Sequence, residues 1–240
     1  MRIGIPAETR AGETRVAATP ETVKTLAAKN EVRVQAGAGA GANFPDQDYQ
    51  AAGAKIVGSA AEAFDADIVL KVRAPQQNEL QFLNANSTLI GLLEPFNTAG
   101  LEAIAKRGVN GFAMESLPRI SRAQPMDVLS SQANIAGYKA VVLAAAEYGK
   151  FFPMLMTAAG TVKAARVLIL GAGVAGLQAI ATAKRLGAVI EASDVRPAVK
   201  EQIESLGAKF LDVPFITDEE REIAQGVGGY ARPMPADWMR

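Results

Sequence analysis

VLILGAGVAGLQ, residues 167–178, is an apolar strand that runs directly into a Gly-x-Gly-x-x-Gly turn. The three glycines are Gly171, Gly173 and Gly176. In a dinucleotide-binding fold the first glycine permits the tight turn, and the second lets the backbone approach a pyrophosphate. The third allows the helix to pack closely on the strand. The free N–H groups and the positive dipole end of the helix beginning at Val174 would then face the phosphates.

An acidic residue stands where such a fold needs one. Asp194 closes the next expected strand, 18 residues (194 − 176) beyond Gly176. A carboxylate at this point accepts a hydrogen bond from the adenosine ribose and repels a 2′-phosphate, which favours NAD over NADP. Arg196 weakens that preference. The turn alone is compatible with an ordinary strand–turn–helix corner, but strand, helix and acidic residue together predict a dinucleotide site.

Strand-like and helix-like runs alternate along the chain, which predicts an α/β fold with parallel sheets. The expected strands are Arg2–Ile5, Glu31–Gln35, Ala54–Val57, Asp67–Arg73, Thr88–Leu93, Val109–Met114, Arg166–Leu170, Val189–Ser193 and Lys209–Val213. The expected helices are Pro20–Lys29, Asp46–Ala52, Ala60–Phe64, Asn78–Leu83, Thr98–Arg107, Met126–Tyr148, Val174–Leu186 and Pro197–Leu206.

We expect two Rossmann-like domains joined by a long helix, because 240 residues exceed the usual size of one domain. An N-terminal α/β domain is expected over residues 1–125, a linking helix over 126–150 and an NAD-binding Rossmann domain over 151–240. The polar, glycine-rich stretch near 218–236 predicts a mobile loop. Only the first half of a dinucleotide fold is recognisable, so the second domain reads as truncated.

Composition excludes several classes of protein. Lys plus Arg and Asp plus Glu are 25 each, so no net field attracts nucleic acid. The absence of Cys and His removes thiolate chemistry, the commonest metal ligand and the commonest general base, so no metal site is expected. The amino terminus lacks a signal peptide, and no apolar run approaches the roughly 20 residues that cross a bilayer. We therefore expect a cytoplasmic chain.

A polar loop precedes the long helix, PRISRAQPMDVLSS at residues 118–131. Arg119 and Arg122 can form forked hydrogen bonds to carboxylate, phosphate or amide oxygens. Gln124 can donate and accept, and Asp127 can pair with either arginine. An alternative is that Asp127 merely caps the helix and the arginines are solvated.

With this loop the sequence resembles the NAD(H)-binding component of proton-translocating nicotinamide nucleotide transhydrogenase, the first domain of its alpha subunit. The other matching stretches are IGIPAETRAGETRVAATP (residues 3–20), the loop with its continuation to residue 138, FPMLMTAAGTVKAARVLILGAGVAGLQAIATAKRLGA (152–188) and DVRPAVKEQ (194–202). Alanine dehydrogenase is a relative that shares the fold and the ETRVA-TP opening. Ala7 and Pro125 depart from the family pattern.

The resemblance implies roles for individual residues. Arg119, Gln124 and Asp127 would be the catalytic positioning residues. The nicotinamide end of NAD(H) would be surrounded by Arg119, Ile120, Ser121, Arg122, Gln124, Asp127 and Ser130. The other contacts implied are Gly171, Gly173, Val174 and Gly176 at the pyrophosphate, Asp194, Val195 and Arg196 at the adenosine ribose, and Gly229 and Tyr230 in a mobile loop that closes over the nucleotide.

The resemblance also implies partners. NADP(H) would be bound by a second subunit, and a membrane-spanning subunit would couple the reaction to proton movement. A homodimer is expected, at the cytoplasmic periphery of an inner-membrane complex. The isolated 240-residue chain is expected to be inactive alone.

The missing histidine agrees with this interpretation. Oxidising an alcohol or an amine releases a proton together with a hydride, so those enzymes keep a proton-handling side chain. Transfer of hydride between two nicotinamide rings releases no proton and needs only two rings held at about 3–3.5 Å with water kept out.

Two alternatives stay open. The first is an alanine-dehydrogenase-like, NAD-dependent amino acid dehydrogenase, because Arg15 and Lys71 match that relative's substrate-binding residues. Its catalytic histidine has no counterpart in TLIGLLEPF, residues 88–96. The second alternative is an NAD-binding fragment without catalysis of its own.

Overall fold

The computed structural model describes residues 1–118, 120–215, 217–225 and 233–236. It divides into two compact units, Met1–Val128 and Leu129–Arg240. Helix α5 (Val128–Glu147) therefore groups with the second unit from Leu129 onward. Among the described residues, no helix combines the length and the apolar character needed to cross a bilayer.

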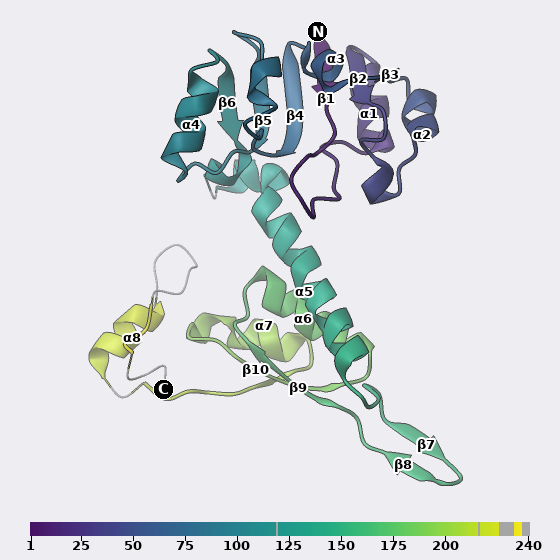
Figure 1. The fold of residues 1–240 in the computed structure, drawn as a ribbon. Coiled ribbons are helices and arrows are strands. Elements are labelled where there is room, and N and C mark those ends of the chain that lie inside the picture. The colour runs from purple at the N-terminus through teal and green to yellow at the C-terminus, as the bar shows by residue number, and fades with distance from the viewer. Residues whose placement is uncertain (119, 216, 226–232, 237–240) are drawn as a thin grey trace. The chain divides into compact units, whose positions relative to one another are not determined.

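The first unit contains a six-stranded parallel sheet in the order β3-β2-β1-β4-β5-β6 (Figure 1). Its strands are β1 (Arg2–Ile5), β2 (Glu31–Gln35), β3 (Lys55–Val57), β4 (Ile68–Arg73), β5 (Thr88–Leu92) and β6 (Asn110–Ala113). Ile3 of β1 lies in register with Val32 on one side and Ile68 on the other. The strand order reverses between β1 and β4, which confirms the predicted Rossmann-like parallel sheet.

Helices connect these strands. They are α1 (Pro20–Ala27), α2 (Asp46–Ala51), α3 (Ala60–Phe64) and α4 (Thr98–Ala105), with 3₁₀ turns η1 (Ala40–Ala42), η2 (Leu80–Phe82), η3 (Met114–Ser116) and η4 (Ser121–Met126). Helix α1 begins as predicted, because the Thr19 hydroxyl accepts from the Thr22 amide and Pro20 occupies the first turn. The helix predicted over Asn78–Leu83 is only the turn η2, since Leu83 already has extended backbone.

Two apolar clusters form the core of the first unit. One contains Ile5, Val34 and Tyr49, and the Tyr49 hydroxyl donates to the Ala18 carbonyl at 2.9 Å. The other contains Phe64 and Leu89. Burial of these side chains fixes the sheet and hence the positions of the loops at its carboxyl edge.

The second unit contains a three-stranded parallel sheet in the order β11-β10-β9. Its elements are β9 (Arg166–Leu170), α6 (Val174–Arg185), β10 (Val189–Ser193), η5 (Pro197–Val199), α7 (Lys200–Ser205) and β11 (Lys209–Phe210). Ile180, Ile190 and Ile203 are buried between the helices and one face of the sheet. Helix α5 packs on α6 so tightly that a Cβ on Gly137 would lie 2.1 Å from the Ala175 carbonyl oxygen.

The other face of this sheet is open among the described residues. Val167 and Ile169 of β9 pack against the core, whereas Leu168 and Leu170 are 54% and 78% exposed. Val189 of β10 lies on the same open face and is also exposed. Parallel sheets are normally covered on both faces, so this one is half-covered.

Two elements differ from the sequence prediction. An antiparallel hairpin of β7 (Leu155–Thr157) and β8 (Gly160–Val162) was not predicted, because three-residue strands are too short to show an alternating pattern. The prediction of a loop from Asp218 was wrong for its first residues, which form α8 (Asp218–Gln225). A capping box that was not recognised in the sequence begins this helix: Glu220 N donates to Thr217 Oγ1, and Thr217 N donates to Glu220 Oε2.

Candidate functional site

Two glycines of the turn between β9 and α6 are required by the fold itself. Gly171 has φ +92°, a backbone conformation that side chains rarely adopt, and its amide donates to the Ser193 carbonyl. A Cβ on Gly176 would lie 1.8 Å from the Gly171 carbonyl oxygen. Gly171 is therefore fixed by conformation and Gly176 by close packing, as the sequence predicted.

Gly173 has no such reason to be glycine. It is the N-cap of α6 with φ −75° and ψ −167°, and a Cβ there would meet nothing within 4 Å. No side chain caps the helix at this point. The space lies in front of the first N–H groups of a 12-residue helix, where an anion is favoured. A pyrophosphate fits this space, and a side chain at residue 173 would compete with it.

Asp194 lies beside the turn, as the sequence predicted. Its Oδ2 accepts from the Ala172 amide at 2.7 Å and from Arg196 Nη2 at 2.9 Å. Its Oδ1 accepts from the Arg196 amide at 2.8 Å and from Arg196 Nε at 2.9 Å. Burial opposes the ionised carboxylate, but the hydrogen bonds from Arg196 and Ala172 hold the pKa of Asp194 below its ordinary value.

The structure thus brings together Gly171, Gly173, Val174 and Gly176 with Asp194–Arg196 in the second unit. Val195 lies between the two charged residues and is half-buried. No group of acidic side chains suited to a metal ion is found in the part of the chain that the structure describes.

The polar loop lies in the first unit. Ile120, Ser121, Arg122 and Gln124 are exposed, and the last three belong to η4, whose carbonyl at Gln124 accepts from the Asp127 amide. Pro125 lies inside η4, and α5 begins at Val128 rather than at Met126.

Asp127 directly precedes α5, and Ser130 lies in its first turn in the second unit; both are half-buried. Arg119, Gly229 and Tyr230 lie outside the described residues.

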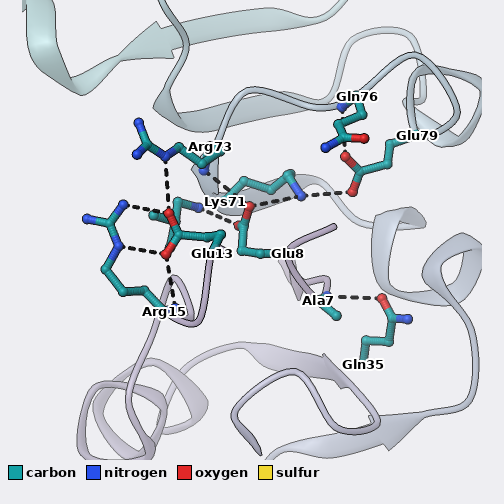
Figure 2. A network of polar contacts seen from close by, with 10 residues as sticks. Ala7, Glu8, Glu13, Arg15, Gln35, Lys71, Arg73, Gln76 and Glu79 are labelled. Carbon is teal, nitrogen blue, oxygen red and sulfur yellow. Dashed lines mark hydrogen bonds and ion pairs between the residues drawn. The ribbon is translucent and has the colours of Figure 1, made fainter. Parts of the chain in front are cut away.

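A second polar cluster occupies the carboxyl edge of the first sheet, where β4 ends (Figure 2). Lys71 is buried, and its Nζ lies 2.8 Å from Glu79 Oε1 and 3.4 Å from Glu8 Oε2. Glu8 also accepts from the Val72 amide at 2.6 Å. The ammonium group of Lys71 is therefore neutralised inside its own unit.

Arg15 is likewise paired. Its Nε and Nη2 donate to Glu13 at 2.8 and 2.6 Å, and Arg73 Nε donates to Glu13 Oε2 at 3.1 Å. The fork from Arg15 lowers the pKa of Glu13 to about 2 despite burial, with further help from Arg73. The sequence pattern singled out Arg15 and Lys71 but not their carboxylate partners. The spacing of Glu13 and Arg15 was the available signal.

The glycine turn, the parallel strands and the carboxylate that binds the turn define a dinucleotide-binding protein of the Rossmann class. Residues 4–136 match the family described as alanine dehydrogenase/PNT, N-terminal domain, and residues 140–230 match alanine dehydrogenase/PNT, C-terminal domain. The chain belongs to the alanine dehydrogenase/PNT family.

Within this family the chain is similar to transhydrogenases. It is 51% identical to the first of the separate chains that form NAD(P) transhydrogenase subunit alpha in Rhodospirillum rubrum, covering 100% of this chain and 64% of that protein. The crystal structure of transhydrogenase from Sinorhizobium meliloti matches with 51% identity and a TM-score of 0.87, covering 92% of this chain and 64% of that one. The resemblance noted in the sequence is thereby confirmed.

Alanine dehydrogenases are more distant relatives. The enzyme of Staphylococcus epidermidis is 34% identical over 86% of this chain and 56% of its own length. A structure of L-alanine dehydrogenase matches with 31% identity and a TM-score of 0.76, covering 88% of this chain and 60% of that one. The chain spans less than two thirds of the length of these relatives and of the transhydrogenases.

Proposed function

We propose that the chain is the NAD(H)-binding part of a proton-translocating transhydrogenase. It would hold NADH while a partner subunit holds NADP⁺. The observation that carries the proposal is Gly173, a glycine that the fold does not need and that leaves space in front of the α6 N-terminus. The similarity to transhydrogenase alpha subunits supports the same conclusion.

The residues of the second unit would hold the adenosine diphosphate half of the cofactor. Gly173 and the amide of Val174 would contact the pyrophosphate, because N–H groups at a helix start bind anions. Asp194 would bind the adenosine ribose and disfavour a 2′-phosphate. Gly229 and Tyr230 would close over the nucleotide.

The polar loop would hold the nicotinamide end. When bound, the nicotinamide supplies the hydride donor or acceptor. Arg119 and Asp127 would orient its carboxamide, and Gln124 would reach toward the second nucleotide. These side chains position and exclude water rather than move protons, which suits a chain with no histidine.

The partners proposed are an NADP(H)-binding subunit, a membrane-spanning subunit and a second copy of this chain, at the cytoplasmic periphery of an inner membrane. A second copy is supported by the hairpin β7–β8. Residues 151–162 contain no charged side chain, and Met154 and Met156 are 57% and 72% exposed. Exposed apolar patches of this kind mark interaction surfaces.

Isothermal titration calorimetry of the chain with NADH, NADPH and alanine tests the proposal. We expect NADH to bind more tightly than NADPH, and no oxidation of alanine in the presence of NAD⁺. Alanine turnover would instead support an amino acid dehydrogenase. Lys71 and Arg15 argue against that outcome, because both are already paired with carboxylates of their own unit.

A further inference from the structure

The acceptor positions of Asp194 are all occupied within the chain. A carboxylate offers about four lone-pair positions, two on each oxygen. Each Asp194 oxygen accepts two of the four hydrogen bonds described above. A ribose hydroxyl that donates to Asp194 must therefore displace one of the present donors.

Only one of these donors can leave at low cost. The amides of Ala172 and Arg196 belong to the backbone of the turn and of the strand end, so they are fixed by the fold. The Arg196 guanidinium is on a flexible side chain that is 19% exposed, whereas the Asp194 side chain is 5% exposed. The guanidinium is thus the group that a ribose would replace.

We propose that Arg196 competes with the adenosine ribose for Asp194 and thereby determines how strictly the site selects NAD(H) over NADP(H). The inference rests on the proposed function and adds a specificity-determining residue to it. The guanidinium weakens NAD(H) binding because it occupies the acceptors that the ribose needs. It also keeps a cation two residues from Asp194, which offsets the repulsion between Asp194 and a 2′-phosphate.

The competition predicts opposite effects on two ligands when the guanidinium is removed. In Arg196→Ala, NADH and ADP should bind about two- to fivefold more tightly, the factor that corresponds to a partly exposed ion pair. Adenosine 2′,5′-bisphosphate should bind more weakly by a similar factor. ADP carries the ribose without a nicotinamide, so its response isolates the adenosine end.

Calorimetric titrations of the wild-type chain, Arg196→Ala and Arg196→Lys with these three ligands test the inference. Lysine keeps the charge but lacks the fork, so its values should lie between the other two. Arg166→Ala is the matched control, because Arg166 pairs with Glu191 at 2.7 Å in the same sheet, at the amino end of β9. The control should change none of the affinities.

Weaker NADH binding by Arg196→Ala would show that Arg196 is itself a cofactor ligand and would overturn the inference. Unchanged affinities, or an equal gain for ADP and for the 2′-phosphorylated ligand, would overturn it as well. If Arg196→Ala unfolds, Arg196→Lys decides by the same criteria. If neither the wild-type chain nor the variants bind NADH, the proposed function fails too; if only the expected gain is missing, the proposed function stands.

Discussion

The three glycines of the turn illustrate how differently one residue type can be required. Gly171 is needed for its positive φ and Gly176 for the 1.8 Å approach of a Cβ to backbone. Both reasons concern folding. Gly173 has an ordinary φ and an empty surrounding, so its reason concerns a ligand. The motif in the sequence indicated all three, but only the geometry separates structural glycines from the binding one.

The first prediction concerns Gly173. Gly173→Ala should fold normally, because the new methyl group meets nothing, and should lose NADH affinity by on the order of tenfold or more. Gly171→Ala should instead lower stability by about 1–3 kcal/mol through backbone strain. Thermal unfolding by circular dichroism and calorimetry with NADH separate the two effects. Unchanged NADH affinity in Gly173→Ala would contradict the proposed pyrophosphate site.

The second prediction concerns Gln124. Replacement by Asn shortens the side chain by one methylene, and in the assembled complex it should slow hydride transfer about 100-fold, while NADH affinity changes less than about twofold. Stopped-flow transfer to NADP⁺ and equilibrium binding give the two numbers. Gln50→Asn, an exposed amide on α2, is the control. Equal losses in rate and affinity would argue against a role in positioning.

The third prediction concerns pH. Because the folded-state pKa of Glu13 is lowered from 4.5 to about 2, its ionised form contributes stability above pH 4.5. That contribution, on the order of 2 kcal/mol, is lost as pH falls through about 2. Glu13→Gln should therefore be less stable than wild type at pH 7, with the difference shrinking toward pH 2. Urea unfolding at several pH values measures it, and a pH-independent difference would refute the assignment.

At the scale of elements, the packing of α5 on α6 connects a long helix to the start of the phosphate site. The contact depends on Gly137, where α5 approaches the Ala175 carbonyl in the first turn of α6. Asn134 Nδ2 donates to Gln178 Oε1 on the same side of the pair, at 3.2 Å. Whatever moves α5 therefore moves the α6 N-terminus.

The fourth prediction follows from this contact. Gly137→Ala should force the helices apart, lower the stability by about 1–3 kcal/mol and weaken NADH binding through the displaced turn. Gly149→Ala is the control, because a Cβ there meets nothing within 4 Å. Thermal melting and NADH titration test both variants. A Gly137→Ala variant as stable as the control would show that the two helices separate without cost.

Some elements can be foreseen from sequence and others cannot. Strong signals gave correct strands and helices, such as Thr19–Pro20 at the start of α1 and the glycines before α6. Weak or local signals were missed, namely the short hairpin β7–β8 and the capping box of α8. Their stability depends on few hydrogen bonds, so no long pattern announces them.

At the scale of the whole molecule, the parallel sheets followed from sequence, whereas pairings between side chains distant in sequence did not. Alternating strands and helices indicated parallel sheets, and β3-β2-β1-β4-β5-β6 is such a sheet. The trio of Lys71, Glu8 and Glu79 required knowledge of which strand ends meet, because Glu8 and Lys71 are 63 residues (71 − 8) apart. Likewise, Asp194 was placed correctly beside the turn, but its occupation by Arg196 was not foreseen.

The fifth prediction concerns the proposed homodimer. Sedimentation of the chain should give a mass of about 50 kDa, twice 25.1 kDa. Met156→Asp should shift it toward the monomer, because a charge in an apolar interface is costly. Phe96→Asp is the control, since Phe96 is fully exposed in the first unit. Dissociation by the control alone would place the interface elsewhere.

The half-covered sheet of the second unit has a practical consequence for anyone who purifies these 240 residues. Leu168, Leu170 and Val189 form an apolar face that water must cover. Such a surface should enhance the fluorescence of a hydrophobic dye such as anilinonaphthalene sulfonate. Ammonium sulfate should precipitate the protein at low concentration, because excluded salts strengthen the association of apolar surfaces. Replacing Leu168 and Leu170 by threonine should reduce both the dye signal and the precipitation.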